Sequence, residues 1–251
     1  MARIFTPFNQ NIYNIFLSQR SRTARYIVIY FAFDEYDIGM DNRCIAFCDS
    51  GIGGLILLKK TVAAFPNENF IYFADSAIKI LISFAPKIIV TACSSLSTFM
   101  MENRRDYGVK IVGVYPIAGK GNGYVFCTPR TEKSGYADTL RKLGAKVVGI
   151  RGLASEIERA VTLGVKPNVE PFFDGFDRNA EYVSLGCTHY GFIRNELSGI
   201  FPNAKLIDGN DEAENEIKSF LSDHRREGGD GEVCFIGAKS DKIAEIYSKI
   251  I

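Results

Sequence analysis

The sequence predicts an α/β protein built of two similar parallel-sheet domains that face each other across a central cleft. From residue 43 onward, short apolar, β-branched runs alternate with helix-like stretches, which is typical of a parallel sheet covered by helices. The apolar runs lack polar alternation, as expected for strands buried on both faces. Two strand ends also carry related motifs, Cys-Ser-Ser at 93–95 and Cys-Thr-His at 187–189, which suggests two similar halves whose loops meet.

The expected elements follow in chain order. The predicted strands are Cys44–Cys48, Phe70–Ala74, Ile88–Ala92, Lys110–Val114, Tyr124–Thr128, Lys146–Ile150, Tyr182–Leu185 and Ala204–Ile207. The helix-like stretches are Gly54–Phe65, Leu96–Tyr107, Glu132–Leu143, Ser155–Leu163 and Asp211–His224. Ligands of such sheets bind beyond the carboxyl ends of the strands. The polar motifs CDSGIGG, CSSLS, TPRTEKS and GCTHYG all stand at those ends.

The chain divides into three parts on this pattern. Residues 1–42 are rich in aromatic residues, Asn and Arg and show no clean strand–helix unit. We interpret them as an N-terminal extension that packs on the surface, or as residues that are included only because of the start codon chosen for the sequence. Residues 43–115 together with 208–251 are expected to form the first α/β domain, and residues 116–207 the second.

Composition excludes some classes of function. A chain of 251 residues that is 47% hydrophobic can bury a full core. Its formal net charge of +1 argues against a nucleic-acid binder that works through general basicity. The six cysteines give a single Cys-x3-Cys pair, and the two histidines lie far apart, so neither a metal site nor a disulfide scaffold is expected.

The apolar runs fall short of the roughly 20 residues that a spanning helix needs. The N-terminus also lacks the pattern of a signal peptide, and unpaired thiols fit a reducing compartment. We therefore expect a cytoplasmic protein with a small-molecule partner, without nucleic acid or membrane, and leave a homodimer open.

Cys93 and Cys187 each stand at a strand-to-helix junction. Amide groups at a helix start lower a thiol pKa from about 8.5, which makes thiolate available as a base. Two such thiols on opposite sides of one carbon could remove a proton from one face and return it on the other. A lone cysteine is more often a small buried hydrophobe, but the paired context favours catalysis.

His189 and the DSGIGG motif each allow two interpretations. A loop histidine is often structural, yet Cys-x-His at a strand end suits thiol tuning or binding of a substrate carboxylate. In DSGIGG, glycines would let the backbone approach an anionic ligand closely. The motif lacks the Lys of a P-loop, and it could equally be an ordinary βα turn.

The segments IAFCDSGIGGLILLKK, VTACSSLSTFM, CTPRTEKSGY, LGCTHYGFI and LIDGNDEA resemble the glutamate racemase family in order and spacing. The resemblance runs from about Cys44 to the region of Asp211. It implies a two-base racemase that needs no cofactor and no metal, with two α/β domains and the active site between them.

The resemblance also assigns residues. Cys93 and Cys187 match the two catalytic cysteines, and Asp49, His189 and Glu158 match the groups that assist them. Substrate-binding positions are Asp49, Ser50, Ser94, Ser95, Thr131, Thr188 and His189. Two departures stand out: Ser94 and Ser95 replace the Asn-Thr that usually follows the first cysteine, and the segment Asp75–Pro86 is short and lacks the family's Pro-Tyr-Gly loop.

Three functions are compatible with these motifs. The first is a glutamate racemase that supplies D-glutamate for peptidoglycan. The second is a related racemase acting on aspartate or another substrate, such as a hydantoin. The third is a catalytically impaired descendant that serves as a binding protein. The two cysteines favour an enzyme, whereas the short 75–86 segment favours the third function.

Overall fold

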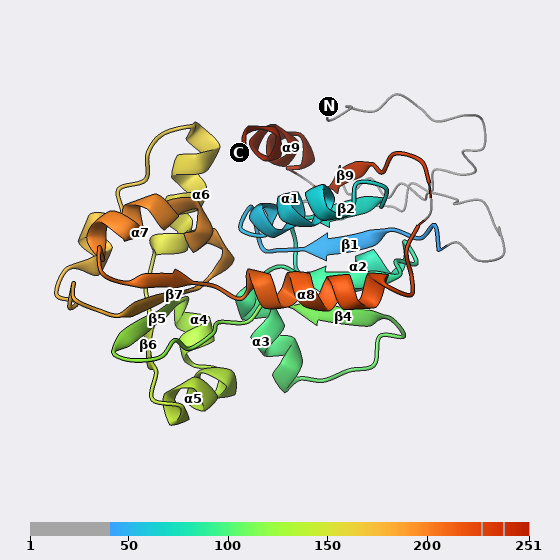
Figure 1. The fold of residues 1–251 in the computed structure, drawn as a ribbon. Helices are drawn as coiled ribbons and strands as arrows, with labels where there is room; N and C mark the ends of the chain where they lie inside the picture. The colour runs from blue at the N-terminus through green and yellow to red at the C-terminus, as the bar shows by residue number, and fades with distance from the viewer. Residues whose placement is uncertain (1–40, 227, 238, 251) are drawn as a thin grey trace, which may run out of the picture.

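The structure, a computed structural model, describes residues 41–226, 228–237 and 239–250. It contains two sheets in which every strand pair is parallel, with helices packed against them (Figure 1). The predicted fold class, two parallel-sheet α/β domains, is therefore confirmed. The expected N-terminal extension lies outside the described residues, apart from Asp41 and Asn42.

The first sheet has the order β4-β3-β1-β2-β9. Its strands are β1 (Ile45–Cys48), β2 (Phe70–Phe73), β3 (Ile88–Thr91), β4 (Lys110–Gly113) and β9 (Val233–Ile236). The central strands β1, β2 and β3 are buried along their whole length, which explains why their sequences are continuously apolar.

Helices cover both faces of this sheet. One face, which includes Phe47, packs against α1 (Leu55–Ala64), α8 (Asn210–Leu221) and α9 (Ser240–Lys249). The opposite face, which includes Ile71, packs against α2 (Ile78–Ile82) and α3 (Ser94–Glu102). The short α2 is all that the 75–86 segment contributes between β2 and β3.

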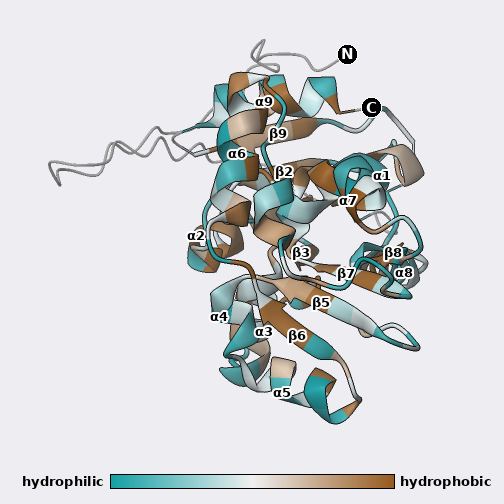
Figure 2. Cartoon of the chain, turned by 90° about the vertical axis from the view of Figure 1, so that its left-hand side faces the viewer, coloured by the Kyte–Doolittle hydropathy of each residue, from teal (hydrophilic) through white to brown (hydrophobic). Residues whose placement is uncertain are grey.

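The second sheet has the order β6-β5-β7-β8. Its strands are β5 (Gly123–Cys127), β6 (Lys146–Gly149), β7 (Tyr182–Gly186) and β8 (Lys205–Ile207). In the hydropathy view, apolar colour gathers on strands such as β5 and β6, whereas the helices mix polar and apolar residues (Figure 2). The apolar strands thus form the interior of this half.

The helices of the second half are α4 (Pro129–Glu132), α5 (Gly135–Lys142), α6 (Leu153–Leu163) and α7 (Arg194–Ile200), with 3-10 turns η1 (Glu170–Phe173) and η2 (Thr188–Ile193). Helices α6 and α7 pack on the face that carries Phe126, and α5 packs on the face that carries Val125. Helix α9 of the first half contacts α6, and the two lie side by side in Figure 2.

Some predicted boundaries were wrong. The predicted helix Leu96–Tyr107 starts earlier, at Ser94, and ends at Glu102. The helix predicted over Glu132–Leu143 begins only at Gly135 and ends at Lys142, while Glu132 is the last residue of the separate helix α4. The later start follows from Ser134, whose side chain accepts a hydrogen bond from the Ala137 amide and caps the helix. The elements β9, α2, α4, α7 and α9 and the 3-10 turns η1 and η2 were not predicted.

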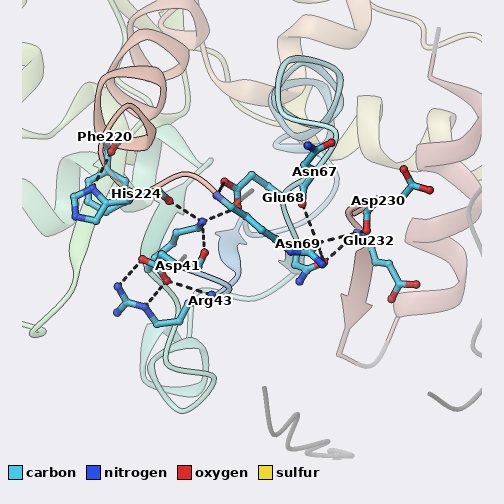
Figure 3. A network of polar contacts seen from close by, with 11 residues as sticks. Asp41, Arg43, Asn67, Glu68, Asn69, Phe220, His224, Asp230 and Glu232 are labelled. Carbon is cyan, nitrogen blue, oxygen red and sulfur yellow. Dashed lines mark hydrogen bonds and ion pairs between the residues drawn. The ribbon is translucent and has the colours of Figure 1, made fainter. Parts of the chain in front are cut away.

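A buried polar network joins the first half to the segment that follows α8 (Figure 3). The Lys87 ammonium and the Glu68 carboxylate form an ion pair at 2.6 Å, with side chains 0% and 1% exposed. Lys87 also donates to the backbone carbonyls of Asp41 and His224, both at 2.9 Å. Glu68 accepts from the Arg226 amide at 2.9 Å. The two buried charges thus lie against each other, as buried ions must.

A hollow of about 430 Å³ lies beside this network and is lined by residues that include Phe65, Glu68 and Arg225. It lies next to the start of β2, away from the carboxyl strand ends where the sequence motifs stand. No helix in the described part of the chain is long and apolar enough to cross a membrane.

Candidate active site

The polar motifs meet where the carboxyl ends of the two sheets approach each other. Asp49 and Ser50 follow β1, and Cys93 follows β3 in the same sheet. Cys187 follows β7 in the other sheet. All strands of a parallel sheet end at the same edge, and the edges of the two sheets meet here, as the hydrogen bond between Asp49 and Thr188, 139 positions apart, shows.

Cys93 lies in an almost closed environment. Its side chain is 9% exposed, and its sulfur lies 3.5 Å from the Ser50 hydroxyl. Burial raises the pKa of the Cys93 thiol, and the charge of Asp49 raises it further, against lowering contributions from Ser50 and from the Leu96 amide. The expectation of a lowered pKa was therefore wrong for Cys93. The helix-start amide does act, but desolvation and a nearby carboxylate outweigh it.

Cys187 has a different set of neighbours. Its sulfur lies 3.9 Å from Nδ1 of His189, and Nε2 of the same ring lies 2.7 Å from the Glu158 carboxylate. Burial disfavours the charged ring, but these two contacts outweigh it and raise the pKa of His189 well above its usual value. The hydrogen bond from His189 in turn lowers the pKa of Glu158. These contacts favour the protonated, positively charged form of the His189 ring beside the second sulfur.

Glu158 reaches this place because of how α6 is built. Leu153, Ile157 and Ala160 are buried on one side of the helix, and Glu158 lies at the edge of that side. The helix starts after Gly152, whose φ of 83° is one that glycine adopts without strain. Helix α6 therefore points the Glu158 carboxylate toward the η2 turn, which carries His189.

Asp49 links the two halves. It is fully buried, and its oxygens accept hydrogen bonds from the Gly51 amide at 2.7 Å and from the Thr188 hydroxyl at 3.2 Å. Burial raises its pKa, while the charge of His189 and the two hydrogen bonds oppose that rise. Thr188 belongs to the second half, so this carboxylate bonds across the boundary between the domains.

The glycines of DSGIGG make room for the opposite loop. A Cβ on Gly51 would lie 2.1 Å from Oε2 of Glu158, and one on Gly53 would lie 2.4 Å from Oγ1 of Thr188 and 2.7 Å from Nδ1 of His189. We expected these glycines to admit an anionic ligand. At Gly51 and Gly53 the adjacent space is instead filled by side chains of the second half.

A cluster of hydroxyl groups forms a further link between the halves. The Ser95 hydroxyl lies 2.7 Å from that of Thr128 and 2.9 Å from that of Thr131. Thr128 also caps α4 through a hydrogen bond from the Thr131 amide. Ser94, by contrast, is buried at the start of α3.

The sequence-predicted residues therefore fall into two groups around the two thiols, with the hydroxyl cluster beside them. Cys93, Ser50 and Asp49 make one group, and Cys187, His189 and Glu158 make the other. Sequence reasoning missed Thr128, although Thr-Pro before a helix is a recognisable capping signal. It also missed Tyr72, whose buried hydroxyl donates to the Gly51 carbonyl at 2.9 Å. Within the described residues, no three His, Cys, Asp or Glu side chains gather as metal ligands would.

Comparison with known proteins points to one family. No family model matches the chain. A glutamate racemase of Clostridium perfringens is 27% identical over 257 residues, which cover 84% of this chain and 97% of that protein. A glutamate racemase of Clostridium novyi is 30% identical over 203 residues, which cover 66% of this chain and 78% of that protein.

Solved structures agree with this assignment. Glutamate racemase from Thermus thermophilus, in complex with β-chloro-D-alanine, shares the fold with a TM-score of 0.69 at 21% identity, covering 84% of this chain and 94% of that one. Glutamate racemase from Francisella tularensis, in complex with D-glutamate, has a TM-score of 0.65 at 25% identity, covering 84% and 95%. The chain therefore belongs to the glutamate racemase family of isomerases.

Proposed function

We propose that this protein interconverts L- and D-glutamate by a two-base mechanism in which Cys93 and Cys187 are the bases, without a cofactor. The observation that carries the proposal is the unlike surroundings of the two sulfurs. Cys93 lies beside a carboxylate and Cys187 beside an imidazolium. Such a pair supplies one proton acceptor and one proton donor at the same time.

The resting protonation states follow from these neighbours. Cys93 keeps its proton, because burial and Asp49 raise its pKa. We place the thiolate at Cys187, where the positive ring of His189 lies 3.9 Å from the sulfur. One turnover moves a proton from the Cys93 sulfur to the substrate and another from the substrate to the Cys187 sulfur, so the opposite arrangement is then reached.

The reaction then moves one proton in and one proton out. The Cys187 thiolate takes the α-proton from one face of the amino acid, and the electron pair of the broken C–H bond remains on the substrate. The Cys93 thiol delivers its proton to the opposite face, which forms the new C–H bond and leaves a thiolate at Cys93. The reverse direction starts from that state.

The α-proton is a very weak acid, so the developing carbanion needs preorganised polar groups. Hydroxyl groups of Ser94, Ser95, Thr131 and Thr188 are the proposed donors to the substrate carboxylate. Asp49 is fully buried, with both oxygens bonded to protein groups. This favours a role for Asp49 in tuning Cys93, and contact with the substrate ammonium would need those bonds to open.

The biological role proposed with this activity is supply of D-glutamate for peptidoglycan, in the cytoplasm. The bound D-glutamate of the Francisella tularensis relative supports glutamate as substrate. A related racemase acting on aspartate is the second candidate. It is compatible with the short 75–86 segment, which forms only the five-residue α2 and so lacks a loop that would discriminate against aspartate.

The test is racemisation of D- and L-glutamate, then aspartate, followed by circular dichroism. Cys93→Ala and Cys187→Ala should each abolish turnover while leaving the fold intact, because each removes the base for one face. Cys234→Ala is the matched control, since that thiol lies in β9 outside the site. In heavy water, deuterium should enter the α-carbon of both enantiomers.

Near wild-type turnover by either site variant would contradict the two-base assignment. Dialysis against a chelator and a carbonyl reagent tests independence from cofactors. Lost activity that a metal or pyridoxal phosphate restores would contradict that part of the proposal.

A further inference from the structure

Gly51 lies at the junction of both halves of the site. Its amide donates to Oδ1 of Asp49 at 2.7 Å, and its carbonyl accepts from the Tyr72 hydroxyl at 2.9 Å. The Glu158 carboxylate covers its Cα, because a Cβ added to Gly51 would lie only 2.1 Å from Oε2 of Glu158. One residue therefore contacts the carboxylate beside Cys93, the carboxylate beside His189, and a tyrosine outside both groups.

Tyr72 is built to hold this residue in place. It lies in β2 opposite Phe47 of β1, and its side chain is 0% exposed. Its ring packs against Phe235 with centroids 6.0 Å apart. Burial raises its pKa well above the usual value, so the phenol stays protonated and remains a donor. A rigid strand residue thus fixes the carbonyl of a loop residue.

The position of the Glu158 carboxylate depends on the loop that contains Gly51. Oε2 of Glu158, the atom nearest the Gly51 Cβ position, is also the atom that bonds His189 at 2.7 Å. The Ile52 amide favours the charged form of Glu158 as well. The place of the carboxylate under His189 is therefore set by the backbone of residues 51 and 52, which belongs to the other domain.

We propose that Tyr72 is a positioning residue which, through Gly51, keeps Glu158 against His189 and Asp49 beside Cys93, and so aligns the two half-sites. The inference rests on the proposed racemisation, but its direct measurement does not need turnover. Removing the hydroxyl would release the Gly51 carbonyl, and the loop would then hold Glu158 less firmly against the imidazole.

The groups that face His189 define what should be measured. They are Cys187 on its own turn, Glu158 from α6 and Asp49 from the loop after β1. Lys239, at the start of α9, acts on Glu158 by charge. Tyr72→Phe alters none of these groups. A fall in the His189 pKa in that variant would therefore report a weaker contact with Glu158.

The experiment is a pH titration of the imidazole signals by NMR in the full-length protein. The chain has two histidines, so His189 is read directly and His224, in the remote network, is an internal reference. A His224→Gln variant assigns the signals. In Tyr72→Phe, the His189 midpoint should fall by about one unit, a tenfold change in proton affinity, while that of His224 stays fixed.

Tyr124→Phe is the matched control. Its hydroxyl accepts from the Asp177 amide at 3.2 Å, away from both thiols, so its loss should leave the His189 midpoint unchanged. Gly51→Ala is a second variant, whose methyl would push Glu158 away and lower the midpoint by another route. An unchanged midpoint in Tyr72→Phe, with the protein folded, would overturn the proposal even if Gly51→Ala failed to fold.

Kinetics give a second, separable readout. Tyr72→Phe should lower kcat about tenfold or more in both directions, because small displacements of reacting groups are costly. It should also move the alkaline limb of the pH–rate profile to lower pH, which a mere loss of stability would not do. If the wild type does not racemise glutamate, the proposed function fails, yet the NMR result still decides the role of Tyr72.

Discussion

Replacing Gly53 with alanine should separate the two halves of the site. The added Cβ would lie 2.4 Å from Oγ1 of Thr188, 2.7 Å from Nδ1 of His189 and 2.8 Å from its backbone nitrogen. The Thr188 hydroxyl can rotate away, but the backbone nitrogen moves only with the η2 turn. Because ordinary contact begins at about 3.4 Å, the loops must move apart by about half an ångström or more.

The expected magnitude follows from that movement. Overpacking of this kind costs about 1–3 kcal/mol, which for a protein of this size lowers Tm by about 2–12 °C. The effect on turnover should be larger, since a misplacement approaching 1 Å can cost about 100-fold. His189 and Thr188 would both shift relative to Asp49. The kcat should therefore fall by between about 10-fold and 100-fold.

The assays are thermal unfolding and steady-state racemisation in both directions, with Gly199→Ala as control. Gly199 lies in α7, and a Cβ there would meet nothing within 4 Å. Alanine at that helical position should raise stability by about 0.5–1 kcal/mol and leave kcat unchanged. A Gly53→Ala protein with the Tm and kcat of the wild type would refute the close packing of the two loops.

Three further results are expected. Lys87→Met should lower the free energy of unfolding, measured in urea, by about 3–5 kcal/mol, because it leaves the buried Glu68 charge without its partner. The kcat of the folded protein should stay unchanged, and a loss of stability below about 1 kcal/mol would contradict the prediction. The pKa of His189 is raised and that of Glu158 is lowered. Their pairing therefore stabilises the folded protein fully between roughly pH 5 and pH 6.5. The stabilisation is lost above that range as His189 deprotonates, and below it as Glu158 is protonated. The stability difference between the wild type and Glu158→Gln, measured by urea unfolding across pH, should follow that window, and a flat difference would refute it. With only a five-residue helix in the 75–86 segment, KM for glutamate should be high and selectivity over aspartate poor, whereas tight, glutamate-selective turnover would show that another segment replaces the missing contacts.

The strands could be predicted because their signal is local. Runs such as CIAFC and IIVTA are apolar throughout, and all eight predicted strands are present in the structure. Strand β9 was missed because it is an edge strand, only partly buried along its length, and its sequence VCFI follows a stretch rich in glycine and charge. Helix α7 was missed because only Leu197 is fully buried in it, which leaves almost no periodic pattern to detect.

The site residues could be named from motifs, but their environments could not. The motif pattern brought Cys93 and Cys187 into one region. It could not show that Cys93 lies beside Asp49 in a desolvated place, and this reverses the expected direction of its pKa shift. Nor could it show that Gly51 and Gly53 face side chains of the second half. Both features depend on which surfaces meet when the two halves pack, and neighbours in the sequence carry no information about that.

The contacts between the two loops of the site also limit access to the two thiols. Cys93 and Cys187 are 9% and 7% exposed, and Asp49 is fully buried, so an amino acid can reach both sulfurs only if the two loops part. The polar links that oppose parting include the hydroxyl–carboxylate bond of 3.2 Å between Thr188 and Asp49 and the hydroxyl contacts of Ser95 with Thr128 and Thr131. Opening would free the Thr188 hydroxyl to serve as a donor to a substrate carboxylate. The Thr188 hydroxyl would then serve in turn as an interdomain contact and as the proposed donor to the substrate.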